Sequence, residues 1–174
     1  MSDETIAPGD EAIALQLRAG LRRLGKAVVT ITAFHDNQRW AMTATAVSEL
    51  SMDPPSLLIC VNKSASMFGG LTAGQANFAV NILHADQIDI SNAGSGATKG
   101  EARFAVGSWK AHPCGTPWLE GAQASFLCRH ERHIEYGTHA GVIGRGINVR
   151  TEGEVDPLIY VDGGYTRVER KAQG

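Results

Sequence analysis

Several features are scarce or absent in this sequence of 174 residues, and each absence excludes a class of protein. Lys and Arg number 16 against 18 Asp and Glu, so no excess of positive charge indicates binding to nucleic acid or to an anionic membrane. No apolar run approaches the roughly 20 residues that span a bilayer. The first four residues, Met1-Ser2-Asp3-Glu4, lack the basic start of a signal peptide. We therefore expect a protein of the cytoplasm that binds neither nucleic acid nor membrane.

Cysteine is also scarce. Cys60, Cys114 and Cys128 are odd in number and widely spaced, with neither a CxxC pair nor the spacing of a metal site. Reduced thiols in a cytoplasmic protein are the simplest interpretation. Cys60 lies inside the apolar run 57–61, which predicts that its thiol is buried as a small apolar group.

One group of side chains looks at first like a metal cluster. His130 and His133 lie beside Glu131 and Glu135. Residues three apart on a strand face opposite sides, so we expect the two imidazoles to diverge and to hold no metal. No catalytic serine stands in a GxSxG motif, and nothing pairs a particular cysteine with a particular histidine.

The pattern of apolar residues predicts one helix followed by many strands. Asp10 is a candidate N-cap, and Gly25 a helix stop. Four apolar residues recur at helical spacing on one face of this helix, Ile13, Leu17, Leu21 and Leu24. Its C-terminal half carries Arg18, Arg22 and Arg23, which we interpret as a solvated face.

After Gly25 the pattern is typical of β-structure. Extended segments are predicted over 27–34, 40–48, 57–61, 76–83, 122–135, 140–149, 157–161 and 164–168, the last two joined by the turn Asp162-Gly163. Short helices are predicted over 67–73 and 86–92. The glycine-containing segment 93–100 lacks the spacing of a phosphate loop and is predicted to be a plain loop. The fold class is therefore mainly β, an antiparallel barrel with an N-terminal helix and a few short helices, in a single domain over 1–174.

Two strand ends are rich in small hydroxyl residues. The first reads Thr43-Ala44-Thr45-Ala46-Val47-Ser48 and the second Asn62-Lys63-Ser64-Ala65-Ser66, with Asp53-Pro54-Pro55 between them. Many N–H and O–H donors beside one cation form a cradle for a phosphate and a planar polar ring. The plainer interpretation is that Ser and Thr mark strand edges and turns.

These segments, followed in order by Phe78-Ala79-Val80-Asn81-Ile82-Leu83, Arg103-Phe104 and Gly137-Thr138-His139, resemble the short-chain flavin reductases. These proteins are the reductase components of two-component aromatic monooxygenases. The resemblance covers about 24–168. It implies a homodimeric split β-barrel that uses NADH or NADPH to reduce free FMN or FAD. The reduced flavin then diffuses to a partner oxygenase.

The resemblance also implies which residues form the site. The flavin ring and ribityl chain would contact Thr43, Ala44, Thr45, Ala46 and Ser48. The phosphate would contact Asn62, Lys63, Ser64, Ser66 and Arg103. The nicotinamide would contact His139, Tyr165 and Arg167. Hydride passes directly between the two cofactors, so no catalytic side chain and no metal are required.

Two alternatives stay open from the sequence. The chain could be a flavin-binding electron carrier or sensor on the same barrel, without turnover. It could instead resemble a pyridoxamine-phosphate oxidase, in which the cradle would hold a pyridoxal ligand. Steady oxidation of NADH in the presence of excess flavin distinguishes the reductase from both.

Overall fold

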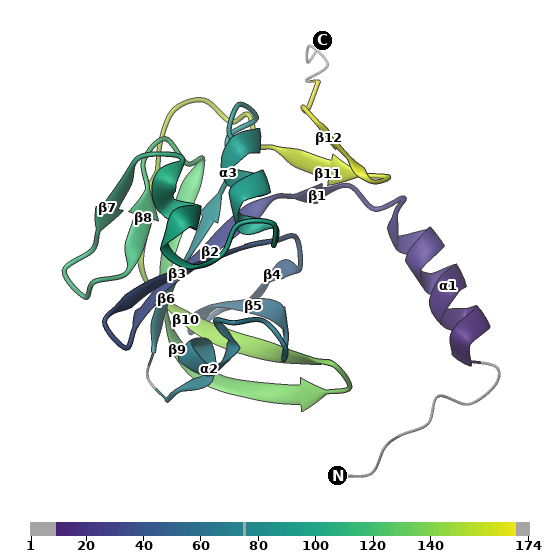
Figure 1. Ribbon diagram of the computed structural model, residues 1–174, viewed down its shortest axis with the longest axis horizontal. Helices are drawn as coiled ribbons and strands as arrows, with labels where there is room; N and C mark the ends of the chain where they lie inside the picture. Colours follow the sequence, from purple (N-terminus) through teal and green to yellow (C-terminus); the bar gives the residue numbers. More distant parts are fainter. Residues whose placement is uncertain (1–9, 75, 170–174) are drawn as a thin grey trace.

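The computed structural model describes residues 10–74 and 76–169, and its centre is one antiparallel sheet of seven strands (Figure 1). The strand order is β3-β2-β6-β9-β10-β5-β4. Their bounds are β2 Val29–His35, β3 Gln38–Ala44, β4 Val47–Met52, β5 Pro55–Asn62, β6 Asn77–Ile82, β9 Ala124–Tyr136 and β10 His139–Thr151. The edge strands β3 and β4 are consecutive in the chain and are joined by Thr45 and Ala46. The predicted antiparallel split barrel is therefore confirmed, with residues 45–46 crossing the split.

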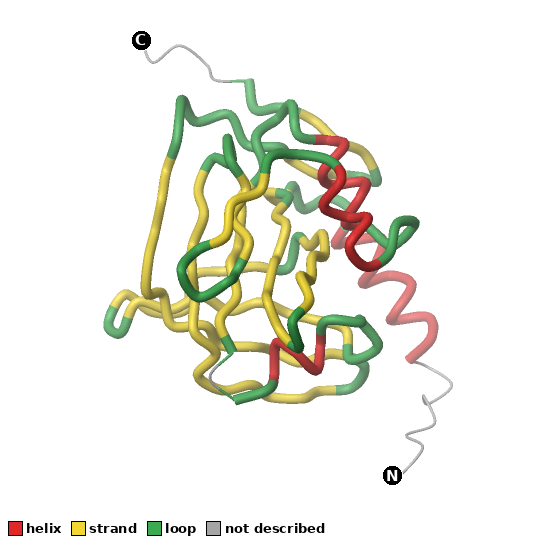
Figure 2. The backbone as a smooth tube through the Cα atoms, turned by 60° about the vertical axis from the view of Figure 1, so that its left-hand side comes forward, coloured by secondary structure: helices red, strands yellow, loops and turns green. Residues whose placement is uncertain are grey.

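Smaller elements surround this sheet, and Figure 2 shows the helices at the periphery of the strands. A three-stranded sheet joins β1 (Lys26–Ala27), β11 (Ile159–Val161) and β12 (Gly164–Thr166). A hairpin pairs β7 (Trp109–Ala111) with β8 (Pro117–Leu119). The helices are α1 (Asp10–Leu21), α2 (Phe68–Thr72), α3 (Ile88–Gly94) and the 3-10 helix η1 (Gly100–Ala105).

The core lies inside the barrel because alternate residues of each strand point inward. Ile31, Ile59, Val80 and Val142 are fully buried there. The opposite face of β6 is also buried, because Trp118 of β8 packs with Ala79 over it. This second layer, with its hairpin β7–β8 and the helix η1, was not predicted.

Most predicted elements are confirmed within one to three residues at each end. The turn Asp162-Gly163 joins β11 to β12, with φ of 49° and 84° at its two residues. The extended segment predicted over 40–48 is wrong in one respect, because the chain leaves β3 at Ala44 and enters β4 at Val47. That break produces the two edges of the barrel.

Helix α1 stands away from the barrel (Figure 1), and none of its residues is buried. Its apolar side chains are largely exposed, Ile13 at 60% and Leu17 at 61%. A helix of 12 residues is marginal in water without tertiary packing. Nothing within residues 10–74 and 76–169 buries the apolar face of α1. Within the described residues, no helix is both long and apolar enough to cross a membrane.

The prediction for Cys60 is wrong. Its neighbours Ile59 and Val61 are fully buried, whereas Cys60 itself is exposed. The three residues alternate across the sheet, so the apolar run places Cys60 on the outer face. Cys128 is the buried cysteine, and burial raises the pKa of its thiol to about 12.

The predicted divergence of His130 and His133 is also wrong. Arg132 pairs with Ile143 while His130 pairs with Gly144, so Glu131 is an extra residue, a β-bulge. A bulge shifts the alternation of side chains by one residue. Nε2 of His130 consequently lies 3.1 Å from Nδ1 of His133, on the same face. Among the described residues, no group of three or more His, Cys, Asp or Glu side chains could hold a metal ion.

The buried histidine predicts acid sensitivity. Burial, and secondly the nearby His133, lower the pKa of His130 below its ordinary value of about 6.5. The unfolded chain then binds more protons than the folded chain, so stability is complete above about pH 6.5 and is lost as the pH falls toward the folded-state pKa. Urea unfolding at pH 7.5 and pH 5.5 measures this loss.

A substitution tests whether His130 causes the loss of stability at low pH. His130→Gln is expected to reduce the loss of stability between the two pH values, whereas His139→Gln, on an exposed turn, keeps it. An unchanged acid loss in His130→Gln contradicts the assignment.

Candidate active site at the barrel split

A cavity of about 680 Å³ opens at the split between β3 and β4. One wall is the crossing segment Thr45 to Ser48, and the floor includes the core residues Val80 and Phe126. Most of its surface is apolar. This volume falls in the range of sites that bury a ligand the size of a flavin ring.

The crossing segment is held in place by β5. The N–H of Cys60 donates to the carbonyl of Ala46 (2.9 Å), and Val47 pairs with Ile59. Val47 packs against the core, which leaves Ala46 and Ser48 exposed at the wall of the cavity. The Thr45 side chain makes no hydrogen bond with any other described residue, so its hydroxyl is available to a ligand.

Two residues of the predicted flavin segment do not line this cavity. The hydroxyl of Thr43 donates to the carbonyl of Ser91 in α3 (2.7 Å). Ala44 packs against the core. A Cβ on Gly94 would lie 2.3 Å from the Thr43 hydroxyl oxygen, so Thr43 serves the close contact between β3 and α3.

The second hydroxyl-rich segment forms a turn at the end of β5. Oδ1 of Asn62 accepts from both the N–H (2.9 Å) and the hydroxyl (2.8 Å) of Ser64. The ammonium of Lys63 lies 3.3 Å from the carboxylate of Glu135. Ser66 is exposed in the turn before α2. The segment 62–66 therefore presents polar groups to solvent, but its cation already has a partner.

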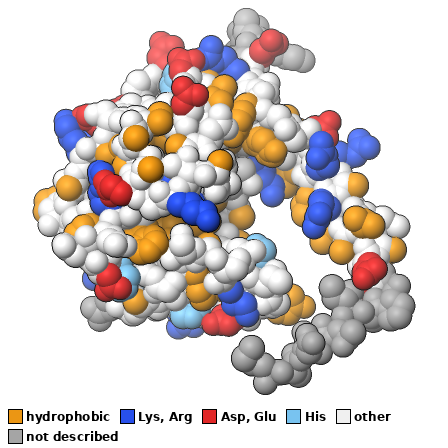
Figure 3. All heavy atoms as spheres, viewed as in Figure 1, with side chains coloured by type: hydrophobic (Ala, Val, Ile, Leu, Met, Phe, Trp, Pro, Cys, Tyr) orange, Lys and Arg blue, Asp and Glu red, His pale blue; other side chains and the backbone are white. Residues whose placement is uncertain are grey.

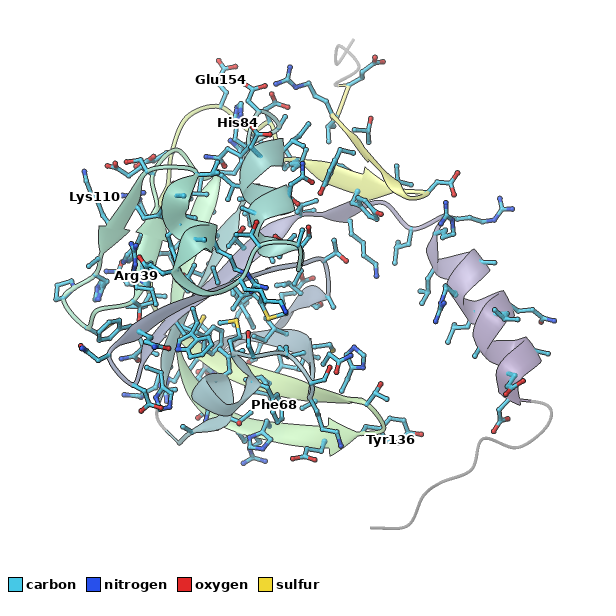
Figure 4. All side chains as sticks on the ribbon, in the orientation of Figure 1. Arg39, Phe68, His84, Lys110, Tyr136 and Glu154 are labelled. Atoms are coloured by element: carbon cyan, nitrogen blue, oxygen red, sulfur yellow. The ribbon has the colours of Figure 1, made fainter. Side chains whose placement is uncertain are left out.

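The Gly137-Thr138-His139 turn lies beside this segment. His139 pairs with Asn62, and the carbonyl of Thr138 accepts from the N–H of Lys63 (3.0 Å). The hydroxyl of Thr138 lies 2.8 Å from Nδ1 of His139. Tyr136, which pairs with His139, is 89% exposed at the tip of the β9–β10 hairpin (Figure 4). The fold thus joins two motifs that lie more than 70 residues apart in the sequence.

Three predicted site residues lie elsewhere, bound to other parts of the fold. Arg103 of η1 donates to the carbonyls of Thr98 (2.8 Å) and Ala41. The Tyr165 hydroxyl lies 2.9 Å from the Ser91 hydroxyl. Arg167 forms ion pairs with Asp86 (2.6 Å) and Asp156 (3.1 Å).

Other cavity residues were not predicted. Leu24, Lys26, Leu58 and Cys60 line it. Leu58 and Cys60 could have been found from the sequence, because residues that alternate with the buried Ile59 and Val61 lie on the opposite face of the strand. Leu24 and Lys26 reach the cavity because β1 pairs with β11, and the sequence carries no local signal for that pairing.

Comparison with known proteins gives the family. Residues 21–169 match the family described as flavin reductase like domain. The chain belongs to this flavin reductase family. It is 36% identical over 157 residues to the reductase component of the FADH(2)-dependent resorcinol hydroxylase of Rhizobium sp. (strain MTP-10005), covering 89% of this chain and 87% of that one. It is also 36% identical over 151 residues to the FMN reductase (NADH) RutF of Variovorax paradoxus, covering 87% and 83%.

A solved structure of the flavin reductase family has the same fold. The NADH:FAD oxidoreductase SgcE6 of Streptomyces globisporus C-1027, in complex with NAD and FAD fragments, superposes with a TM-score of 0.85 at 27% identity, covering 98% of this chain and 99% of that one. The predicted activity, reduction of a flavin by a nicotinamide cofactor, is confirmed by these relatives. They favour the reductase over the pyridoxal-binding alternative.

The residues at the split fit a flavin. The cavity offers apolar walls for a planar ring, a hydroxyl at Thr45 without a partner among the described residues, and a small side chain at Ala46 that allows close approach. In the turn 62–66, at the end of β5, the N–H and hydroxyl of Ser64 already donate to Asn62. The side-chain amide N–H groups of Asn62 and the hydroxyl of Ser66 have no partner among the described residues, and they are the donors available to a phosphate. Apolar surroundings with a few placed polar groups are typical of cofactor sites.

Proposed function

We propose that this flavin reductase uses NADH or NADPH to reduce FMN or FAD as a diffusing co-substrate, and that the reduced flavin supplies a separate oxygenase. The observation that carries the proposal is the apolar cavity at the split, with the 62–66 turn and His139 on the adjoining strand ends. The name of the Rhizobium relative, a reductase component of a hydroxylase, supports the role of supplier.

When both cofactors are bound, the nicotinamide supplies a hydride that the flavin accepts. The protein's part is to bind, orient and exclude water. Ala46 lets the ring lie close to the crossing segment, and the Thr45 hydroxyl donates a hydrogen bond to its polar edge. The side-chain amide of Asn62, the ammonium of Lys63 and the hydroxyl of Ser66 would hold the phosphate, and the exposed imidazole of His139 would orient the nicotinamide. Alignment of two reactants at contact distance accounts for much of the rate in such reactions.

The number of turnovers tests the proposal. Anaerobic NADH oxidation is followed with FMN or FAD in about 100-fold excess over protein, then repeated with NADPH. A diffusing co-substrate predicts that most of the flavin is reduced. A carrier or sensor predicts no more than one equivalent per protein, and that result would overturn the proposed function.

His139→Ala is expected to raise the KM for the nicotinamide cofactor by about tenfold while the Kd for FMN stays within twofold. The reason is that the exposed imidazole is proposed to bind the nicotinamide and not the flavin, and a lost hydrogen bond to a charged or polar ligand costs about 1.4 kcal/mol. Steady-state kinetics and equilibrium titration measure the two constants. An unchanged KM for the nicotinamide cofactor would show that His139 does not contribute to the nicotinamide site.

The ion pair between Lys63 and Glu135 gives opposite predictions for its two members. Lys63→Ala is expected to weaken FMN binding about tenfold, because a charge-assisted bond to the phosphate is lost. Glu135→Gln is expected to strengthen it, because Lys63 loses its competing partner at 3.3 Å. Riboflavin, which has no phosphate, is the control ligand and should bind both variants as it binds the wild type. Equal effects on riboflavin and FMN would contradict a phosphate contact.

We also propose that the protein is a homodimer in which α1 packs against a second copy. An isolated helix of this length with exposed Ile13 and Leu17 needs a partner surface. The double variant Ile13→Glu/Leu17→Glu is expected to yield monomers in analytical ultracentrifugation, with Glu11→Gln as the control. Dimers of unchanged affinity in the double variant would exclude this role for α1.

Two further features complete the proposal. The three cysteines are free thiols, which supports a reducing compartment, the cytoplasm. One continuous sheet takes strands from residue 29 to residue 151, which supports a single functional domain.

A further inference from the structure

A second, smaller pocket of about 210 Å³ adjoins the split cavity. It lies between the C-terminal end of α1 and the turn that joins β11 to β12. Leu24, Lys26 and Thr45 line both the pocket and the cavity, so one ligand can extend from one into the other. Figure 3 shows Lys or Arg side chains around the C-terminal end of α1, across a hollow from the barrel.

Arg22 fixes the shape of this pocket. Its guanidinium donates to Oδ1 (3.0 Å) and to the carbonyl (2.8 Å) of Asp162, whose own N–H donates to the carbonyl of Arg22 (2.8 Å). The backbone of Gly163 has φ of 84°, a conformation that favours glycine, and the Arg22 guanidinium lies close to its Cα. The helix end and the hairpin turn are thereby held together by both backbone and side chain.

Two cations of the pocket remain free. Arg18 and Lys26 line it, and neither side chain has an ion pair or hydrogen bond to any other residue in 10–74 or 76–169. The cations predicted for the site are engaged elsewhere, Lys63 by Glu135 and Arg167 by two aspartates. Among the described residues that line the pocket, Asp162 alone carries a carboxylate, and it is paired with Arg22. These residues therefore give the pocket a net positive charge and mainly donors.

An aromatic ring stands beside these cations. Tyr160 pairs with Lys26 across β1 and β11, and 39% of it is exposed. Its ring is fixed by a T-shaped contact with Tyr165, with 5.4 Å between centroids. A fixed, partly exposed aromatic ring is a stacking surface for a nucleobase, and guanidinium and ammonium groups are the usual partners of phosphate.

We propose that this pocket binds the adenosine phosphate part of a dinucleotide whose redox ring lies in the split cavity. Arg18 and Lys26 bind the phosphate, and Tyr160 contacts the adenine. NAD(P)H is the dinucleotide that fits, because in FAD a single oxygen joins the adenosine phosphate to the flavin phosphate, which is assigned to the turn 62–66, and no residue of that turn lines this pocket. The inference rests on the proposed function for the position of the ring, but the binding measurements below do not need turnover.

Charge reversal at Arg18 of α1, compared with the same change at an arginine in the turn after the helix, tests the proposal. Arg18→Glu is expected to weaken binding of ADP and of NADH or NADPH by at least about tenfold, equivalent to about 1.4 kcal/mol. Lys26→Ala is expected to act in the same direction. Arg23→Glu makes the same charge change at an exposed position that does not line the pocket, so its affinities should stay within twofold.

Calorimetric titrations with ADP, FMN, FAD, NADH and NADPH separate the outcomes. Weaker NADH or NADPH binding with unchanged FMN and FAD binding supports the assignment to the nicotinamide cofactor. Weaker FAD binding with unchanged NADH and NADPH binding overturns it, because that result places the flavin's own adenylate in the pocket. Losses in Arg18→Glu no larger than in Arg23→Glu, or an equal loss for FMN, overturn the proposal. Failure of the proposed function is recognised separately, as absence of NADH oxidation by the wild type.

Discussion

Ala46→Trp is expected to raise the Kd for FMN by at least about 100-fold and to abolish NADH oxidation. Ala46 is an exposed residue on the wall of the cavity, so an indole there occupies the space of a flavin ring without entering the core. A small side chain at this point is what permits a planar ring to approach the crossing segment. Flavin fluorescence titration and steady-state assays measure the two effects.

The control for this substitution is Ala111→Trp. Ala111 is an exposed residue of β7 that does not line the cavity. Its replacement adds the same indole to the protein surface and should leave FMN affinity within twofold. Thermal unfolding of both variants should resemble that of the wild type. Wild-type activity in folded Ala46→Trp would place the flavin outside the split.

Gly144→Ala is expected to destabilise the fold by about 1–3 kcal/mol. Its Cβ would lie 2.3 Å from Cζ of Phe78 and 2.9 Å from Cβ of Cys128. Both neighbours are fully buried in the core, so neither can move aside without opening a void. For a chain of this size, the Tm should fall by about 2–4 °C for each kcal/mol.

Gly146→Ala on the same strand is the matched control. Its nearest neighbour would be the carbonyl oxygen of Pro55 at 3.6 Å, an ordinary van der Waals contact. Its Tm should therefore stay close to the wild-type value. A Tm of Gly144→Ala equal to that of Gly146→Ala would show that the core beside β10 accommodates a methyl group.

Local sequence patterns were sufficient for much of the fold. The Asp162-Gly163 turn was predictable because few residue pairs adopt positive φ twice in succession. The apolar periodicity of 77–82 was sufficient to predict β6. The two hydroxyl-rich segments marked the neighbourhood of the site, because their donors are properties of residue type rather than of tertiary packing.

Features that depend on pairing between distant segments were not predictable. The bulge at Glu131 reverses the expected divergence of two histidines, yet it is defined only by the register of β9 against β10. The β7–β8 hairpin is attached through Asn81, whose Oδ1 accepts from the N–H of Leu119 (3.2 Å). No local pattern reports such contacts.

The same limit applied to the charged residues of the site. Arg103 and Arg167 have side chains that commonly bind anions. In the structure, however, Arg103 donates to backbone carbonyls, and Arg167 pairs with two aspartates of distant segments. From the sequence, Arg18 was interpreted as part of a solvated face. Its position beside Lys26 and Tyr160 depends on the ion pair between Arg22 and Asp162, which the sequence does not reveal. Charge in a sequence identifies candidates, and tertiary pairing decides which of them stay free.

Crystals of the protein soaked with FMN show directly whether the cavity at the split holds the flavin. The isoalloxazine ring is expected to lie against residues 45–48, with the phosphate toward the turn 62–66 and one face of the ring open beside His139. Density for the flavin at another surface, or side chains of a second copy filling the cavity, would contradict it.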